Sequence, residues 1–568
     1  MRTLLCARTF SATTESEGHI MSPSDRTHPL SWGDTFFLYL EREGQPINIA
    51  SACEFEGKIS RRACAKFVES KLDLIPRYRQ RAVFPSFNLG LPNWELDPDF
   101  DIFNHVHEVV LKQGTDNDLK AETAKVISST LDRNHPLWDI TLVQGLKRNR
   151  TGMIIRIHHC MADGISGVGV MHALLDASPA PGEPEPKEPR PERPRPTDSV
   201  AMLLDEALKS YQTFMQGAFT AQSEVLTIAR ELLAGATQGH SEELLHLVPE
   251  LGSPSDRLPF NKICRGPQQI AWGELPMADI KAIRGSCGGT VNDVVLTVIA
   301  STVRRYAKQH GVNLRGRQLR MIVPVNIRGD GDVAELGNRI TFLPINVPLF
   351  ISDPRALLAR ISERITFLRS IGVPEMVGMF GTLVSKVPLA VQAALVPVLT
   401  QLPLSLANMI CTNVPGPQVP LYMLGHKLLR CYPYVPIGGE MGVNVAILSY
   451  NGVAYVGFGG DVTAVPDIEL FEEMLRESFA ELCKAAASVA PAHVDDEEPA
   501  RKKARPRPIP EAPTKTGRKK PLMRKIPVAA APPARKKPAR KTVPFPSGIP
   551  VKGVSAERPR RFFAQTGD

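Results

Sequence analysis

The sequence predicts an α/β protein built from two folded halves of similar type. Stretches with strand-like alternation and stretches with helical spacing follow one another in residues 31–177, and the same mixture returns in residues 255–488. Between them lies a proline-rich segment at 178–198, in which eight prolines alternate with charged residues. Such a segment forms a semi-rigid polyproline spacer, so we expect two layered halves that face one another.

The length and composition allow for extensions around these halves. A chain of 568 residues that is 43% hydrophobic can bury two sizeable cores. The end of the chain is rich in Pro, Ala, Lys and Arg and cannot bury a core, so disorder is expected there. The predicted segments are a flexible extension (1–30), an N-terminal domain (31–177), the spacer (178–198), a helical connector (199–254), a C-terminal domain (255–488) and a disordered basic tail (489–568).

Individual elements follow from the spacing of apolar residues. Apolar side chains at every second position predict strands, and apolar spacings of three and four predict helices. In the first half the predicted strands are 50–59, 107–114, 140–146 and 152–159, and the predicted helices are 61–75 and 119–133. After the spacer, 199–235 has helical spacing, followed by helices at 291–311 and 470–489 and strands at 318–327, 342–350, 442–450 and 452–460.

The charge of the chain is concentrated in its tail. Residues 501–568 hold 20 lysines and arginines against three acidic residues, a net charge of +17, whereas the whole chain carries +9. The rest of the chain therefore carries −8, which argues against nucleic acid as a substrate. We expect the tail to attract anionic lipid headgroups, with non-specific binding of nucleic acid or polyphosphate as the alternative.

Cysteine usage and apolar runs bear on the compartment. Nine cysteines form an odd set without a CxxC pair, so neither a zinc knuckle nor a disulfide framework is predicted and a reducing compartment is expected. The first 20 residues contain only a short apolar patch, so no export signal is expected, and Met21 is an alternative start.

The nearest candidate for a membrane-spanning helix is 387–411, but its three prolines disfavour a single continuous helix. A buried or tunnel-lining segment is favoured there, with membrane docking as the alternative.

The stretch RIHHCMADGISG (156–167) places two adjacent histidines at the end of an apolar run. The residues before them alternate as a strand that ends at His158, and Asp163 with Gly164 favours a turn. Because successive side chains of a strand point to opposite faces, His158 and His159 are expected to do different jobs, one facing a cleft and the other the interior.

A histidine at a cleft can remove a proton from a hydroxyl or thiol near neutral pH, because its ordinary pKa is about 6.5. The residues alone leave two alternatives open: a pair of satisfied histidines at a strand end, and a metal site. Neither an HExxH pattern nor a third clustered ligand follows, so no metal is expected. Asp163 can either pair with an arginine to hold the loop or orient an imidazole directly.

The segment HHCMADG (158–164) matches the HHxxxDG motif of the bifunctional wax ester synthase/diacylglycerol acyltransferase family, within the wider chloramphenicol-acetyltransferase-like acyltransferases. One such motif is weakly specific, but the chain resembles this family over about residues 31–485, with its signature segments in family order. These segments are DTFFLYLER (34–42), NHPLWDI (134–140), TVNDVVL (290–296), LGNRITFLPINVPL (336–349) and TNVPGPQVPLYMLG (412–425). The spacer, the first 30 residues and the basic tail depart from the family pattern.

The resemblance implies a fold of two chloramphenicol-acetyltransferase-like domains, each a mixed β-sheet flanked by helices, with an active-site channel at their interface. It implies that His159 is the general base, which takes the proton of an acceptor hydroxyl as that hydroxyl attacks an acyl thioester, and that His158 supports the loop. Asp163 is expected to hold the loop through an ionic contact with an arginine that the sequence does not identify. Gly164 is expected to permit the turn.

Two further motifs are expected near this site. Pro136, Leu137 and Trp138 are expected to pack beneath it, with substrate contact as the alternative. The apolar segment 377–411 is expected to line the path of an acyl chain, since each buried methylene contributes about 0.8 kcal/mol.

In the second half, Asn292 is either a donor to the tetrahedral oxyanion or, as we favour, a structural residue that holds the halves in register with Asp293.

The resemblance predicts an O-acyltransferase that moves a fatty acyl group from acyl-CoA to diacylglycerol or a long-chain alcohol. No cofactor is expected beyond acyl-CoA as co-substrate. We expect a cytoplasmic protein, peripheral to the inner face of the membrane or to lipid droplets, without a specific nucleic-acid partner. A non-catalytic lipid-binding or lipid-droplet scaffold protein is the alternative.

Overall fold

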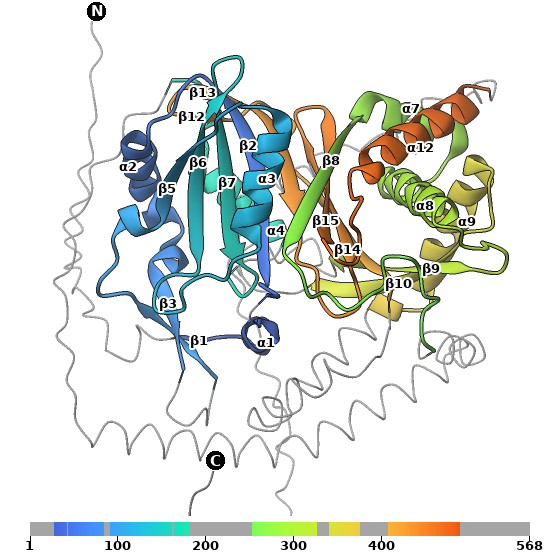
Figure 1. The fold of residues 1–568 in the computed structure, drawn as a ribbon, viewed down its shortest axis with the longest axis horizontal. Helices are drawn as coiled ribbons and strands as arrows, with labels where there is room; N and C mark the ends of the chain where they lie inside the picture. Colours follow the sequence, from blue (N-terminus) through green and yellow to red (C-terminus); the bar gives the residue numbers. More distant parts are fainter. Residues whose placement is uncertain are drawn as a thin grey trace, which may run out of the picture. The chain divides into compact units, whose positions relative to one another are not determined.

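The computed structural model describes residues 28–42, 44–84, 91–161, 164–180, 253–326, 340–374 and 407–488. The chain separates into two units, residues 1–495 and 496–568, and everything described below belongs to the first. The predicted helix at 199–235, residues 377–406 of the predicted acyl path and the basic tail lie outside the described residues. Two large sheets with their helices, and one small sheet, make up the described part (Figure 1).

The first large sheet has six strands in the order β12-β13-β2-β7-β6-β5. Its neighbouring strands are antiparallel except for β5 and β6, which are parallel. The strands are β2 (Asn48–Glu56), β5 (Val106–Val110), β6 (Trp138–Leu146), β7 (Arg150–His158), β12 (Tyr422–Met423) and β13 (His426–Tyr434). A small separate sheet joins β1 (His28–Pro29), β4 (Asn93–Leu96) and β3 (Gln80–Val83).

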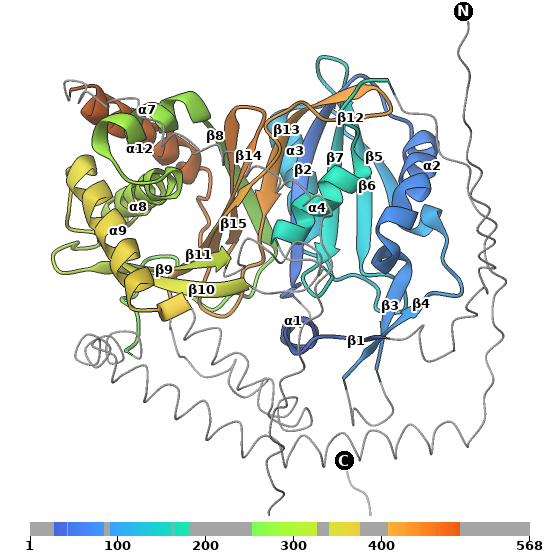
Figure 2. The ribbon, with the colours of Figure 1, turned by 180° about the vertical axis from the view of Figure 1, so that it is seen from behind.

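Helices cover both faces of the first sheet. Helix α3 packs between β7 and β8, whereas α2 and α4 pack together on the opposite face (Figures 1 and 2). The helices of this half are α1 (Trp32–Leu40), α2 (Arg61–Lys71), α3 (Asp116–Ile127) and α4 (Gly164–Leu174), with single 3-10 turns at Leu72–Leu74, Pro76–Arg79 and Ile102–Asn104.

The second large sheet has the order β10-β9-β11-β14-β15-β8 and is also mixed, because β11 runs parallel to both of its neighbours. Its strands are β8 (Gln268–Pro276), β9 (Gln318–Asn326), β10 (Ile340–Pro348), β11 (Met409–Pro415), β14 (Val443–Tyr450) and β15 (Val453–Asp461). The helices α7 (Met277–Cys287), α8 (Val291–Gln309), α9 (Pro354–Ser370) and α12 (Leu470–Ala487) gather on one side of it (Figure 1).

Strand β13 joins the two halves. It follows β11 in the second half of the chain but pairs with β2, and so completes the first sheet. Gly457 of β15 permits the close approach of β13, since a Cβ there would lie 1.9 Å from the Pro433 carbonyl oxygen. The Tyr432 ring stacks on Trp272 at a centroid distance of 4.4 Å, and the Tyr432 hydroxyl donates to Glu274 over 2.7 Å. The halves are therefore tied by an exchanged strand.

The predicted fold class is confirmed: both large sheets are mixed and carry flanking helices. All predicted strands and helices that fall on described residues are present, with shifted ends. The helix predicted at 61–75 ends at Lys71, and Ile75 is not helical because it precedes Pro76. The helix predicted from 119 begins three residues earlier, because Thr115 and Asp118 form a capping box.

Among the described helices, none is by itself long and apolar enough to cross a membrane. The pair Met277–Cys287 and Val291–Gln309 reaches the required length and apolarity together, with a bend of 100° between the two helices.

Candidate functional site

The two adjacent histidines lie where β7 ends and a turn begins. His158 is the last residue of β7 and is opposite Asn48 of β2. His159 is the first residue of the turn, and its backbone N–H donates to the Ile47 carbonyl oxygen over 2.9 Å. Strand alternation separates their rings, as the sequence predicts: His158 is completely buried, whereas His159 is half-buried.

His158 is fixed on both sides of its ring. Its Nδ1 accepts a hydrogen bond from the Cys160 backbone N–H over 3.2 Å, which assigns the ring proton of the neutral imidazole to Nε2. Nε2 lies 3.5 Å from Oε1 of Glu41, longer than a good N–H···O hydrogen bond. Burial, with a smaller contribution from Arg133, lowers the pKa of His158 to about 3, so the ring is neutral at physiological pH.

The His159 ring packs against helix α1. Its centroid lies 3.9 Å from that of Phe37, with an angle of 24° between the ring planes. The aromatic contact limits the orientations that the ring can adopt, and the residue as a whole is half-buried. Of the two rings, His159 is therefore the more exposed.

Two charged residues that the sequence reasoning missed complete this site. Glu41 follows α1 directly and its side chain is 4% exposed. Nη2 of Arg133, in the loop between α3 and β6, donates to Glu41 Oε2 over 3.1 Å and to the Leu38 carbonyl oxygen over 2.7 Å. Glu41 lies in the quoted segment DTFFLYLER, but neither its type nor its spacing indicated a contact with the histidines.

The remaining residues of the HHxxxDG motif are only partly visible. Asp163 lies outside the described residues, so its arginine partner stays a prediction. Gly164, predicted to permit a turn, is the first residue of helix α4. A buried arginine–carboxylate pair, between Arg156 of β7 and Asp139 of β6, lies two residues before His158.

The Pro136–Trp138 element supports the end of β7 from the neighbouring strand. The Leu137 carbonyl oxygen accepts the His158 backbone N–H over 2.9 Å, and Leu137 itself is fully buried. The Trp138 indole donates to the Tyr78 carbonyl oxygen over 2.8 Å and stacks on His105 at 4.5 Å. These contacts place the element in the core beneath the histidines, which is the packing role expected of it.

Asn292 and Asp293 lie at the start of helix α8. Asp293 is buried and forms a capping box with Thr290, whose backbone N–H donates to Asp293 Oδ2 over 2.9 Å. Asn292 Oδ1 accepts from Asn413 Nδ2 of β11 over 3.1 Å. Both contacts stay within the second half, which differs from the expected role of holding the two halves in register, because Asp293 is used by its own helix terminus.

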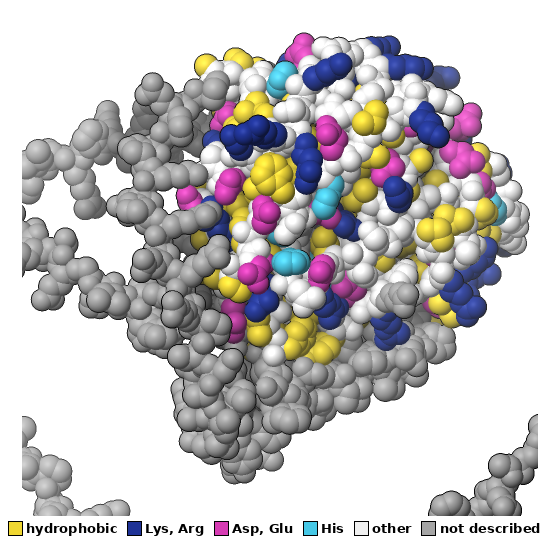
Figure 3. Space-filling model, turned by 60° about the vertical axis from the view of Figure 1, so that its left-hand side comes forward, with side chains coloured by type: hydrophobic (Ala, Val, Ile, Leu, Met, Phe, Trp, Pro, Cys, Tyr) yellow, Lys and Arg dark blue, Asp and Glu magenta, His cyan; other side chains and the backbone are white. Residues whose placement is uncertain are grey.

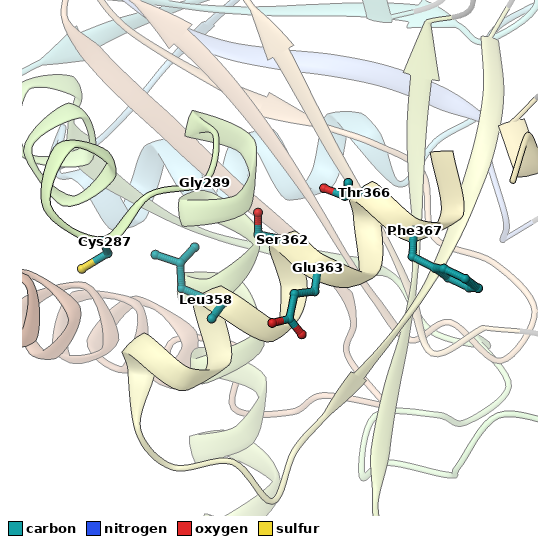
Figure 4. Close-up of a pocket in the computed structure, with 8 residues that line it drawn as sticks. Cys287, Gly289, Leu358, Ser362, Glu363, Thr366 and Phe367 are labelled. Atoms are coloured by element: carbon teal, nitrogen blue, oxygen red, sulfur yellow. The ribbon is translucent and has the colours of Figure 1, made fainter. Parts of the chain in front are cut away.

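Two of the cavities in the described part are a groove in the second half and a small cavity in the first, and neither of these two is lined by His158 or His159. An open groove of about 540 Å³ lies between the α7–α8 loop and α9, next to Cys287, Gly289, Ser362 and Glu363 (Figure 4). A wholly apolar cavity of about 10 Å³ lies between α2, α4 and β7. The channel expected at the interface of the halves therefore stays a prediction. Within the described ranges, no three His, Cys, Asp or Glu residues cluster as metal ligands.

Sequence comparison finds the same family along most of the chain. The model of the wax ester synthase/diacylglycerol acyltransferase catalytic domain matches residues 30–295, and the model of the WS/DGAT C-terminal domain matches residues 336–483. A probable diacylglycerol O-acyltransferase of Mycobacterium tuberculosis (strain ATCC 25618 / H37Rv) is 28% identical over 412 residues, which cover 72% of this chain and 84% of the relative. A putative diacylglycerol O-acyltransferase of the same strain is 27% identical over 465 residues, covering 79% and 89%.

Solved structures share the fold. The wax ester synthase/diacylglycerol acyltransferase from Marinobacter aquaeolei VT8 aligns with a TM-score of 0.55 at 22% identity, over 81% of this chain and all of that one. The first condensation domain of the calcium-dependent antibiotic synthetase aligns with a TM-score of 0.52 at 15% identity, over 83% of this chain and 99% of that one. At these identities the likeness concerns the arrangement of the two mixed sheets.

Proposed function

The chain belongs to the wax ester synthase/diacylglycerol acyltransferase family and is an acyl-CoA-dependent O-acyltransferase, and from this premise we propose that His159 is its general base. The acceptor is the hydroxyl of a diacylglycerol, giving triacylglycerol, or of a long-chain alcohol, giving a wax ester.

The difference between the adjacent histidines carries this proposal. His158 is completely buried, its Nδ1 is occupied by the Cys160 N–H and its pKa is lowered to about 3 by burial, so it can neither reach a substrate nor hold a second ring proton at neutral pH. His159 is half-buried and lies at the end of the strand. An imidazole in that position is suited to accept a proton near pH 7.

The reaction is a direct transfer in a ternary complex. The acceptor oxygen attacks the thioester carbonyl carbon while His159 takes the hydroxyl proton. The tetrahedral intermediate then collapses, the carbon–sulfur bond breaks, and the thiolate of CoA takes the proton from the imidazolium. A lipid hydroxyl has a pKa far above neutrality and needs the base, whereas the thioester already has a good leaving group. The chain contains no GxSxG element, in line with attack without an acyl-enzyme.

The test is the release of free CoA from a fatty acyl-CoA, with a diacylglycerol and a long-chain alcohol as separate acceptors and chromatography of the lipid product. We expect His159→Ala to lower turnover by at least about 100-fold. His107→Ala is the matched control, because it removes an exposed imidazole from β5. Full activity in His159→Ala would remove the proposed mechanism. If the protein binds lipid but releases no CoA with either acceptor, the lipid-binding or scaffold alternative is favoured.

We also propose that the basic tail keeps the enzyme at anionic lipid surfaces, on the inner face of the membrane or on lipid droplets. Residues 501–568 of the tail carry +17, whereas the face of the folded part in Figure 3 interleaves basic and acidic side chains and presents no large basic patch. Each basic residue near an anionic surface contributes about 1 kcal/mol. Truncation after Asp495 is expected to preserve turnover on dispersed substrate and to reduce membrane or droplet association in cell fractionation. Unchanged fractionation would contradict this role.

A further inference from the structure

The C-terminal turn of helix α1 contacts the histidine pair from two directions. Phe37 stacks on the His159 ring at 3.9 Å. Glu41, the residue that follows the helix, lies 3.5 Å from Nε2 of His158. A carboxylate with a 4% exposed side chain is costly to bury unless it has partners, so each of its contacts bears on its role.

The first group of contacts holds the buried histidine. His158 Nδ1 accepts from the Cys160 N–H, so the ring proton lies on Nε2, the atom that faces Glu41 Oε1. A negative charge opposite that N–H favours this tautomer over the alternative one, which would place a lone pair against the carboxylate. Glu41 therefore stabilises the ring orientation in which His158 Nδ1 accepts the Cys160 N–H. This hydrogen bond holds the turn that contains His159.

The second group of contacts reaches His159 through the backbone. Oε1 of Glu41 accepts the Ile47 N–H over 3.3 Å, and the carbonyl oxygen of Ile47 accepts the His159 N–H over 2.9 Å. Loss of the carboxylate releases Ile47, and with it the backbone partner of His159.

Arg133 fixes the carboxylate itself. Its Nη2 bonds to Glu41 Oε2 over 3.1 Å and to the Leu38 carbonyl oxygen over 2.7 Å, so one nitrogen binds both the side chain and the end of α1. Arg133 also precedes the Pro136–Trp138 element in the chain, whose Leu137 carbonyl oxygen accepts the His158 N–H. The arginine thus joins the two segments that flank the histidines.

We propose that Glu41, held by Arg133, is a positioning residue for His159. It touches no substrate and acts through His158 and Ile47, and the proposal rests on the proposed function of His159 as the base. A displacement of a reacting group by about 1 Å can cost 100-fold in rate, so the position of the imidazole matters as much as its presence. The rival explanation is a buried ion pair that only stabilises the fold.

Steady-state kinetics on the full chain separate these explanations. Glu41→Ala is expected to lower kcat by about 10- to 100-fold while the KM for acyl-CoA changes by less than about threefold, because orientation of the base is lost and binding is not. Glu41→Gln keeps the volume and one acceptor oxygen but loses the charge, and is expected to lie between Glu41→Ala and the unchanged enzyme. This second variant keeps the test decisive if Glu41→Ala does not fold.

Glu54→Ala is the matched control. Glu54 has a 3% exposed side chain and pairs with Arg150 over 2.6 Å, but it lies near the far end of β2, six residues from the position opposite His158. If burial and ion pairing alone matter, Glu41→Ala and Glu54→Ala lose thermal stability together and both keep kcat. That result would overturn the proposal.

A double-mutant cycle with His159→Ala gives the sharpest readout. If Glu41 acts through His159, Glu41→Ala lowers the residual rate of His159→Ala by less than about twofold, because the group that it positions is already gone. An undiminished 10- to 100-fold effect in that background would show an independent role and contradict the proposal. If His159→Ala keeps full activity, the proposed function fails. If it is inactive but Glu41 variants behave like Glu54→Ala, only the positioning role fails.

Discussion

At the scale of single residues, two adjacent histidines have imidazole rings in different environments. The alternation of β7 sends His158 into the core, and the turn that follows leaves His159 half-buried against Phe37. The buried ring is neutral because burial lowers its pKa to about 3. The pair therefore places one ring in the core and one half-buried ring at the end of the strand, from adjacent positions in the sequence.

The lowered pKa of His158 predicts a pH dependence of stability. In the unfolded chain the ring takes up a proton below about pH 6.5, whereas in the folded protein it does so only near pH 3, so the unfolded state binds more protons between these values. The contribution of His158 to the free energy of unfolding is therefore complete above about pH 6.5. It is lost as the pH falls toward 3, by up to about 1.4 kcal/mol per pH unit for this one group.

Urea denaturation at pH 7, 6 and 5 measures this effect. His158→Gln is expected to be less stable at pH 7 but to lose less stability on acidification than the unchanged protein. His107→Gln, on an exposed strand position, is expected to retain the full acid dependence. Parallel curves for His158→Gln and the unchanged protein would contradict the neutral, buried state of His158.

At the scale of elements, helix α8 connects two of the family segments. Thr290 and Asp293 cap its N-terminus, most of its length is buried, and Asn292 reaches Asn413 of β11. The segments TVNDVVL and TNVPGPQVPLYMLG, more than 100 residues apart in the chain, are thus joined by one amide–amide hydrogen bond. Asn292 and Asp293 therefore mainly stabilise the structure of the second half.

This arrangement predicts different outcomes for two neighbouring substitutions. Asp293→Ala removes the carboxylate of the capping box from a buried site and is expected to cost about 1–2 kcal/mol of unfolding free energy in urea denaturation. Asn292→Ala is expected to lower kcat by less than about tenfold, since its carboxamide oxygen is engaged by Asn413. A loss of 100-fold or more in Asn292→Ala, with stability unchanged, would instead indicate a donor to the oxyanion.

At the scale of the whole molecule, the exchanged strand β13 makes the two halves one structure. It covers the edge of β2, which would otherwise expose unpaired backbone groups, and its Cys431 faces Cys53 with the two sulfur atoms 3.1 Å apart. The eight cysteines of the described residues are free thiols, and this pair is completely buried. The contact between halves is thus built from packing and strand pairing.

The exchange predicts that both halves unfold together. Gly457→Ala is expected to destabilise the protein strongly, because its Cβ would lie 1.9 Å from the Pro433 carbonyl oxygen and must push β13 away from β15. Calorimetry is expected to give one unfolding transition for the folded part, shifted as a whole to lower temperature by Gly457→Ala. Gly285→Ala, in helix α7 with nothing near its Cβ, is the control for glycine loss without a clash. Two independent transitions, of which only one moves, would contradict the coupling.

The sequence by itself determined the α/β class, the strands and helices with clean periodicity, and the histidine pair with its separation of faces. These features depend on local spacing, because alternation and helical period are properties of neighbouring residues. The HHxxxDG motif and the ordered family segments also indicated the reaction, an acyl transfer from acyl-CoA to a hydroxyl. Element ends were less accurate, because caps such as Thr115–Asp118 and the constraint before Pro76 act through particular contacts.

Only the tertiary structure decided which distant residues meet. β13 has no clean alternation and contains Pro433, so its sequence does not indicate that it leaves its own half to pair with β2. Glu41 and Arg133 lie 92 positions apart, and their ion pair next to His158 depends on how α1 packs over the end of β7. The physical reason is the same in both cases: such contacts are stabilised by the packing of the whole core, which no local pattern encodes.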